Sequence, residues 1–229
     1  MNTPKSLGKR AKRLGKRLKL WLGLARPYQR KRADGTDERW QLIRRELDAG
    51  DRSLLDIGSN LGVLTELAAG EGLFALGVEP DFRLVRAARR RTRSARSVGF
   101  VCAAVDPDSV AALPACDVVL CLSVHHYWVR AFGEEAAWRI MGVLLARARR
   151  KLFFEPASVK RKFGAAAPDF EDLDREAIVE YNVKHLESLL APDQRVRFLG
   201  ETRCRPREPF RLVFLIERRP AGREDPGAR

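Results

Sequence analysis

Apolar residues along this chain fall into two alternating patterns, which are short apolar runs and longer stretches with helical spacing. Runs such as 53–57 and 117–122 are too short for typical helices and are bounded by turn residues, so they predict strands. Stretches such as 134–150 repeat apolar residues every three or four positions and predict helices. Strands are predicted at 53–57, 73–78, 98–103, 117–122, 152–154, 195–201 and 210–217, and helices at 36–50, 61–69, 82–96, 134–150 and 171–190, with a short helical turn near 109–113.

Strands that alternate with helices imply a parallel sheet, because each crossover helix returns the chain to the same end of the sheet. No helix separates the last two predicted strands, so one of them should run antiparallel. The pattern therefore predicts an α/β fold: a Rossmann-like, mostly parallel seven-stranded sheet with helices on both faces and a C-terminal antiparallel strand. This domain is assigned to residues 36–219, and residues 220–229 are expected to be a disordered tail.

Charge separates the first 35 residues from this domain. Residues 1–32 contain twelve Lys or Arg and no acidic residue. Removing these twelve from the 44 basic residues of the chain leaves 32, against 30 acidic ones, so the remainder is nearly neutral. Leu7, Ala11, Leu14 and Leu18 have helical spacing, so this basic arm is either an amphipathic helix or a disordered tail. A basic helix of this kind is suited to an anionic membrane surface or to RNA.

The cysteines and the N-terminus exclude some classes of protein. Cys102, Cys116, Cys121 and Cys204 have no C-x-x-C spacing and no histidines at metal-ligand spacing, so they are interpreted as buried free thiols and no metal site is expected. No apolar run is long enough to span a membrane, and no secretory signal follows the basic start. These features predict a cytoplasmic protein, peripheral to the inner membrane face if the basic arm binds lipid.

A glycine-rich turn follows the first predicted strand, in the segment Asp56-Ile57-Gly58-Ser59-Asn60-Leu61-Gly62. Glycine lets the backbone turn sharply and approach a ligand, and the N–H groups of the next helix favour an anion. A dinucleotide site requires G-x-G-x-x-G, but position 60 is Asn. The second strand ends at Glu79, whose carboxylate would accept hydrogen bonds from a ribose diol and repel the 2′-phosphate of NADP.

This combination of motifs resembles the class I S-adenosylmethionine-dependent methyltransferases, over roughly residues 40–218. The resemblance implies S-adenosyl-L-methionine as the cofactor, with Asp56, Gly58, Asn60 and Gly62 along its methionine half and Glu79 at its ribose. It places Val105 and Asp106 at the adenine edge. The adjoining residues Ser59, Pro80 and Ser123 complete the predicted cofactor site.

The acceptor side is predicted beyond the fourth and fifth strands, where an open α/β sheet faces its ligand crevice. His125 and His126 follow the fourth strand and are candidate general bases, since a neutral imidazole accepts protons near pH 7. Glu155 ends the fifth strand and is a candidate to orient a histidine. The cluster 160–162, Lys-Arg-Lys, is either a binding site for an acceptor phosphate or carboxylate or a solvated turn.

A closer resemblance is to the methyltransferase domain that caps bacterial O-antigen polysaccharides. It rests on Leu122-Ser123-Val124-His125-His126, Phe154-Glu155, Phe198-Leu199-Gly200-Glu201 and Arg211-Leu212-Val213-Phe214. It implies a glycan or its terminal phosphate as acceptor. The sequence thus favours a methyltransferase of a saccharide, lipid-linked or other small acceptor.

Two other functions remain open on the sequence alone. Seven arginines at 83, 86, 89, 90, 91, 93 and 96, together with the basic arm, are compatible with an rRNA or tRNA methyltransferase. Alternatively, the chain is a non-catalytic scaffold that binds the cofactor without turnover.

Overall fold

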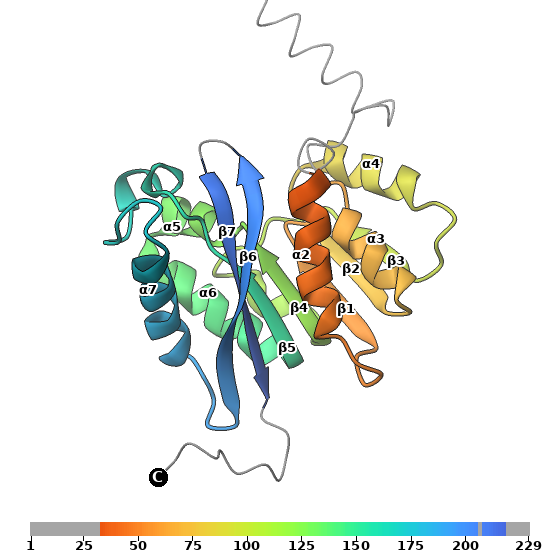
Figure 1. The fold of residues 1–229 in the computed structure, drawn as a ribbon. Helices are drawn as coiled ribbons and strands as arrows, with labels where there is room; N and C mark the ends of the chain where they lie inside the picture. The colour runs from red at the N-terminus through yellow and green to blue at the C-terminus, as the bar shows by residue number, and fades with distance from the viewer. Residues whose placement is uncertain (1–32, 206–207, 219–229) are drawn as a thin grey trace, which may run out of the picture.

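The structure is a computed structural model that describes residues 33–205 and 208–218 (Figure 1). The predicted basic arm is described only from residue 33, and the predicted tail, residues 220–229, lies outside the described residues. The domain boundaries drawn from the sequence therefore stay predictions.

Seven strands form one sheet in the order β3-β2-β1-β4-β5-β7-β6. The first five strands in this order are parallel to one another. Strand β7 is antiparallel to both β5 and β6, and β6 is the outermost strand beyond it. The strands are β1 (Ser53–Ile57), β2 (Phe74–Val78), β3 (Val98–Val101), β4 (Cys116–Leu122), β5 (Ala148–Glu155), β6 (Gln194–Arg205) and β7 (Glu208–Arg218). This sheet confirms the predicted fold class.

Helices cover both faces of the sheet (Figure 1). The helices are α2 (Ala33–Arg45), α3 (Val63–Gly70), α4 (Phe82–Arg91), α5 (His125–Phe132), α6 (Glu134–Arg147) and α7 (Arg175–Glu187), with short 3-10 turns at Val110–Ala112, Lys160–Lys162 and Gly164–Ala166. Side chains of α2 and α3 share one core cluster, and those of α5, α6 and α7 share the other. The sheet therefore separates two apolar layers.

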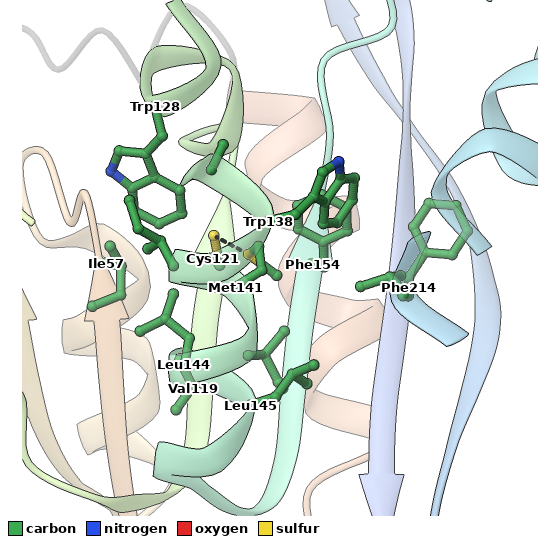
Figure 2. Packing of buried hydrophobic residues seen from close by; sticks show 14 of the residues in the cluster. Ile57, Val119, Cys121, Trp128, Trp138, Met141, Leu144, Leu145, Phe154 and Phe214 are labelled. Carbon is green, nitrogen blue, oxygen red and sulfur yellow. Dashed lines mark hydrogen bonds between the residues drawn. The ribbon is translucent and has the colours of Figure 1, made fainter. Parts of the chain in front are cut away.

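Alternate residues of the central strands enter opposite layers, as the two-residue period of a strand requires. In β4, Val118 and Leu120 pack with α2 and α3, whereas Val119 and Cys121 pack with α6. Figure 2 shows the second layer, where Cys121 contacts Met141 with a sulfur–sulfur distance of 3.6 Å. Burial on both faces explains why these strands are continuous apolar runs in the sequence.

Two elements differ from the sequence prediction around β5. The predicted helix 134–150 ends at Arg147, and Ala148 already pairs with Cys116 in the sheet. The basic residues that follow extend β5, where Lys151 binds Asp51 and Asp48 with nitrogen–oxygen distances of 2.6 and 2.7 Å. These charges resembled the polar side of a helix, but their long-range ion pairs hold them in a strand.

Helix α5 was not predicted. It is eight residues long, and no side-chain hydrogen bond caps its first turn, so its sequence carries neither a long period nor a start signal. Other ends shift by a few residues: α2 begins at Ala33 rather than Thr36, and α4 ends at Arg91 rather than Arg96.

Three of the four cysteines have thiols that the structure describes. Cys116 and Cys121 are buried and free, as expected, but Cys102 is exposed, so the expectation that all four thiols are buried is wrong for it. Its position just after the edge strand β3 leaves it uncovered. Among the described helices, none combines the length and apolar character needed to cross a membrane.

The turn between β1 and α3 depends on a close contact at Gly62. This residue has φ 66°, in the left-handed region, and a Cβ built there would lie 2.4 Å from the ring of Phe100. Phe100 itself packs with Val85 and Ala88 of α4. Gly62 therefore lets the β1–α3 turn lie against β3 and α4.

Gly62→Ala is expected to destabilise the protein by about 2–4 kcal/mol, because it combines left-handed strain with overpacking against Phe100. The matched control is Gly70→Ala, since a Cβ at Gly70 meets nothing within 4 Å. Urea unfolding should show a lower midpoint for Gly62→Ala only. Equal midpoints for the two variants would contradict the role given to this contact.

Candidate active site

A large cavity opens where the strand order reverses. Strand β1 lies between β2 and β4. The connections that follow neighbouring strands here therefore leave toward opposite faces of the sheet, and a crevice opens between them. The cavity, of about 820 Å³, is lined at this end by the last residues of three strands, Ile57, Val78 and Leu122. Its size and position are those of a small-molecule site in an open α/β sheet.

The turn after β1 forms one wall of the cavity. Gly58 has φ 70°, and a Cβ at this position would lie 2.6 Å from the side chain of Val124. Asn60 also has a positive φ, 53°, and its side-chain oxygen accepts the N–H of Leu61 at 2.9 Å. Gly58 and Asn60 both line the cavity, so the backbone of this turn faces it.

Glu79 lies at the junction of this wall with the next. Its two carboxylate oxygens accept the backbone N–H groups of Asn60, at 2.9 Å, and Asp81, at 3.0 Å. These bonds fix the carboxylate between the loops that follow β1 and β2. Burial raises the pKa of Glu79, and the two N–H donors partly offset this. Glu79 and the next residue, Pro80, both line the cavity.

Asp56 lies below the turn and does not line the cavity. Its carboxylate accepts the hydroxyl of Thr65 at 2.7 Å, and the residue is 4% exposed. Burial raises the pKa of Asp56 to about 7, against the opposing effects of Thr65 and Arg39. Asp56 thus supports the turn from beneath. Ser59 and Gly62 are likewise outside the cavity lining.

The third wall is formed by residues after β3. Val105 lines the cavity, and its carbonyl oxygen accepts the indole N–H of Trp128 at 2.8 Å. Asp106 points into its own turn, where it accepts the N–H groups of Ser109, at 2.8 Å, and Asp108, at 3.1 Å. Trp128 therefore belongs to the cavity wall, and Asp106 stabilises the turn behind it.

Two buried arginines and a buried glutamate form the floor near β4 and β5. Glu155 is fully buried and pairs with Arg39, with a nitrogen–oxygen distance of 2.9 Å, and with Arg211, at 3.6 Å. The hydroxyl of Ser123 donates to Glu155, and Arg211 donates to Ser123 at 3.0 Å and to the carbonyl of Pro156 at 3.1 Å. Arg39, Arg211 and Ser123 line the cavity, whereas Glu155 lies behind them.

His126 reaches the cavity from the first turn of α5. It is 4% exposed, and its Nδ1 atom has no hydrogen-bond partner among the residues that the structure describes. Burial, reinforced by the nearby cations Lys162, Arg211 and Arg130, lowers the pKa of His126 to about 3. The imidazole is therefore neutral and weakly basic at pH 7.

His125 points away from the cavity into the apolar layer. Its ring lies 4.3 Å from that of Trp138 and 5.7 Å from that of Phe154, measured between centroids. Burial lowers the pKa of His125 to about 3 as well. The structure thus separates the two histidines that the sequence placed together, and of the two only His126 faces the cavity.

The cavity brings together part of the predicted site and adds residues that the sequence analysis missed. The predicted residues that line it are Gly58, Asn60, Glu79, Pro80, Val105, Ser123 and His126, and those that do not are Asp56, Ser59, Gly62, Asp106, His125 and Glu155. Arg39, Arg130 and Arg211 were not predicted. Arg211 stood in a motif of the closer resemblance without a site role, as a charged residue inside the apolar run of β7 that a surface strand would also show.

Part of the chain is similar to a known methyltransferase domain. Residues 55–146 match a family model described as a methyltransferase domain. No curated protein sequence matches the chain. Among solved structures, the bifunctional kinase-methyltransferase WbdD has a TM-score of 0.59 and 21% identity, covering 87% of this chain and 42% of that one. The chain thus spans about two fifths of the length of WbdD.

Two further structures share the fold. Magnesium protoporphyrin IX methyltransferase (ChlM) from Synechocystis PCC 6803, with bound SAM, has a TM-score of 0.56 and 18% identity, with 80% of each chain covered. EvdMO1 has a TM-score of 0.56 and 20% identity, covering 81% of this chain and 41% of that chain. Residues 55–146 thus match a methyltransferase domain, and the solved structures share the predicted α/β architecture.

The buried histidines predict acid sensitivity. Each has a folded pKa of about 3, below the value of about 6.5 expected when unfolded, so stability is complete above pH 6.5 and is lost as the pH falls toward 3. At pH 5 each histidine should cost about 2 kcal/mol of the free energy of unfolding.

The variant His125→Phe isolates this effect, because the ring at 125 contacts Trp138 and Phe154 and a phenyl group suits that layer. Urea unfolding of the wild type and the variant at pH 7.5 and 5 should show a smaller acid loss in the variant, by about 2 kcal/mol. An equal loss in both proteins would show that His125 is not buried in its neutral form.

Proposed function

We propose that this protein is an S-adenosylmethionine-dependent methyltransferase that acts on a small acceptor, such as a saccharide or a lipid-linked molecule. The observation that carries the proposal is the carboxylate of Glu79, fixed in the cavity wall beside the turn at Gly58. A carboxylate held in this way accepts hydrogen bonds from a vicinal diol. The cofactor then occupies the half of the cavity between β1 and β2, and the acceptor occupies the half near β4 and β5.

The residues present fit S-adenosylmethionine. The cavity volume of about 820 Å³ is within the range for ligands of this size. The backbone at Gly58 and Asn60 suits the amino-acid end of the cofactor, Glu79 the ribose, and Val105 the base. ChlM, which shares the fold, has been solved with SAM and with SAH bound. When bound, the cofactor supplies a methyl group on a positively charged sulfur.

The residues of this chain would align the acceptor with the methyl group of the cofactor and exclude water from the site. Little further activation is needed, because the sulfonium cofactor already has an excellent leaving group. The β1–α3 turn and Glu79 hold the cofactor, and Trp128 fixes the wall at Val105. Ser123, which has φ 61°, is held by hydrogen bonds with Glu155 and Arg211. These contacts keep the end of β4 rigid where the acceptor approaches.

The acceptor half has an aromatic edge. Tyr127 and Phe132 line the cavity and are 60% and 45% exposed. Exposed rings at a cavity mouth provide apolar faces on which a sugar ring or a lipid segment packs. These residues support an acceptor that enters from outside and is only partly enclosed.

Glu79→Gln is expected to weaken the binding of S-adenosylhomocysteine by about 10- to 100-fold, because it removes the charge from the hydrogen bonds to the ribose. Isothermal titration calorimetry measures this directly. The matched control is Asp108→Asn, an exposed acid outside the cavity, which should bind as the wild type does.

S-adenosylmethionine should also bind to the wild type, whereas NAD should not. Tight binding of NAD, or equal affinity of the Glu79 and Asp108 variants for S-adenosylhomocysteine, would overturn the proposed cofactor site. Binding of the cofactor without transfer to any acceptor would favour the non-catalytic scaffold instead.

A second candidate function, RNA methylation, is favoured by a smaller cavity beside α4. This cavity, of about 510 Å³, is lined by Phe82, Val85, Arg86, Arg89, Arg90, Arg93 and Cys102. Arginines beside an exposed aromatic ring are suited to phosphates and stacked bases. We rank it second because the chain beyond residue 32 carries nearly equal numbers of basic and acidic residues.

Deletion of residues 1–32 tests the proposed membrane role of the basic arm and the RNA alternative together. The deletion variant should lose binding to liposomes that contain an anionic phospholipid and should still bind S-adenosylhomocysteine. Unchanged liposome binding would remove the membrane role. Binding of tRNA by the full chain, with a steep decrease as salt rises, would favour the RNA alternative.

A further inference from the structure

Helix α5 lies between the two halves of the main cavity and contacts each half with a different side. Residues four positions apart share one side of a helix, whereas residues two positions apart point about 200° apart. Trp128 therefore shares a side with Val124, the residue just before the helix. His126 and Arg130 share the opposite side. All four residues line the cavity.

The first side of α5 contacts the walls assigned to the cofactor. The indole N–H of Trp128 donates to the carbonyl oxygen of Val105 at 2.8 Å. Val124 packs so closely on the β1–α3 turn that a Cβ at Gly58 would lie 2.6 Å from its side chain. Val105 is the position proposed for the base, and Gly58 that for the amino-acid end. Helix α5 is thus joined to both ends of the cofactor half.

The second side of α5 contacts the segment that follows β5, residues 156–174. The ring of His126 lies 6.2 Å from that of Phe163, measured between centroids. The side chain of Arg130 lies beside Gly164, where a Cβ would be 3.6 Å from its Nε atom. A change in the position of α5 therefore changes the acceptor half of the cavity.

The position of α5 depends on these tertiary contacts, because the helix has few local determinants. It is eight residues long, and no side-chain hydrogen bond caps its first turn. Residues with a positive φ lie at both ends, Ser123 with φ 61° and Gly133 with φ 85°. A helix of this length is marginal without contacts from the rest of the fold.

We propose that Trp128 is a positioning residue that couples occupancy of the cofactor half to the order of α5, and through α5 to the acceptor half. This coupling rests on the proposed cofactor site and describes its regulation. A cofactor packed on Val105 and on the turn at Gly58 restricts both walls. Helix α5, which is joined to both, then loses less conformational entropy when it takes a single position. By linkage, an acceptor binds more tightly to the protein loaded with cofactor than to the empty protein.

Hydrogen–deuterium exchange of the full chain, with and without saturating S-adenosylhomocysteine, tests this coupling without a known acceptor. In the wild type, the ligand should slow amide exchange about 10-fold in residues 125–133, and also in the turn 58–62. Trp128→Phe keeps an aromatic ring and removes the hydrogen-bond donor. This variant should bind S-adenosylhomocysteine within about 3-fold of the wild-type affinity and keep the slowing at 58–62. It should lose most of the slowing at 125–133.

The ratio of exchange rates with and without ligand separates coupling from a merely structural role, which would change both rates alike. Trp138→Phe is the matched control, since Trp138 lies on α6 in the same apolar layer but outside the cavity lining (Figure 2). It should keep the wild-type ratio at 125–133. Val124→Ala reduces the other contact and leaves the indole in place, so it should also lower this ratio if Trp128→Phe does not fold.

Binding of S-adenosylhomocysteine to the wild type without slower exchange at 125–133 would overturn this inference and leave the proposed function intact. Equal ratios in the Trp128 and Trp138 variants would likewise remove the role given to Trp128. If S-adenosylhomocysteine does not bind to the wild type at all, the proposed function is wrong and the coupling is lost with it.

Discussion

Burial of both faces of the central strands is the constraint on which the rest of the structure depends. The side chains of β1 and β4 enter two apolar layers, one with α2 and α3 and one with α5, α6 and α7. Most side chains along these strands are therefore apolar. Polar groups gather at the carboxyl ends, where the strand order reverses between β1 and β4 and the backbone is free to turn.

The polar groups at this edge are supported from below by polar and charged side chains that are themselves buried. Asp56 holds Thr65 beneath the β1–α3 turn, and Glu155 holds Arg39 and Arg211 beneath the end of β4. Glu155 and its two arginines are buried charges, which are costly unless they are paired, so each depends on its partner being in place. Arg39 comes from α2, before the sheet begins, and Arg211 from β7, its last strand. The site is therefore complete only when both ends of the domain are packed.

Different parts of the chain supply the two halves of the cavity. The half that carries Gly58, Asn60 and Glu79 lies within the region that matches a methyltransferase domain. The opposite half receives its cations Arg39, Lys162 and Arg211 from flanking segments. Under the proposed function, the cofactor half lies within the matched domain, and the acceptor half also draws on the segments that flank it.

The sequence by itself determined the number of strands, their mostly parallel direction and the antiparallel end, because these follow from the local period of apolar residues and from the presence or absence of a connecting helix. It also indicated the turn at Gly58 and the acid at Glu79, since both lie within a short motif at a strand end. It missed α5, which is short and has no side-chain cap. It also extended α6 into β5, because the basic residues at the start of β5 resemble the polar face of a helix, and their ion pairs with Asp48 and Asp51 are visible only in the folded structure.

Only the tertiary structure decided which polar side chains meet. His125 and His126 are adjacent in sequence, but successive residues of a helix point in directions about 100° apart, so one enters the core and the other the cavity. Arg39, Glu155 and Arg211 are far apart in sequence and are brought together by the packing of α2 against the sheet and by the pairing of β5 with β7. The local period of apolar residues specifies which face of each element is buried. The charge around a site, in contrast, comes from side chains of several elements that are distant in sequence and become neighbours only when the chain folds.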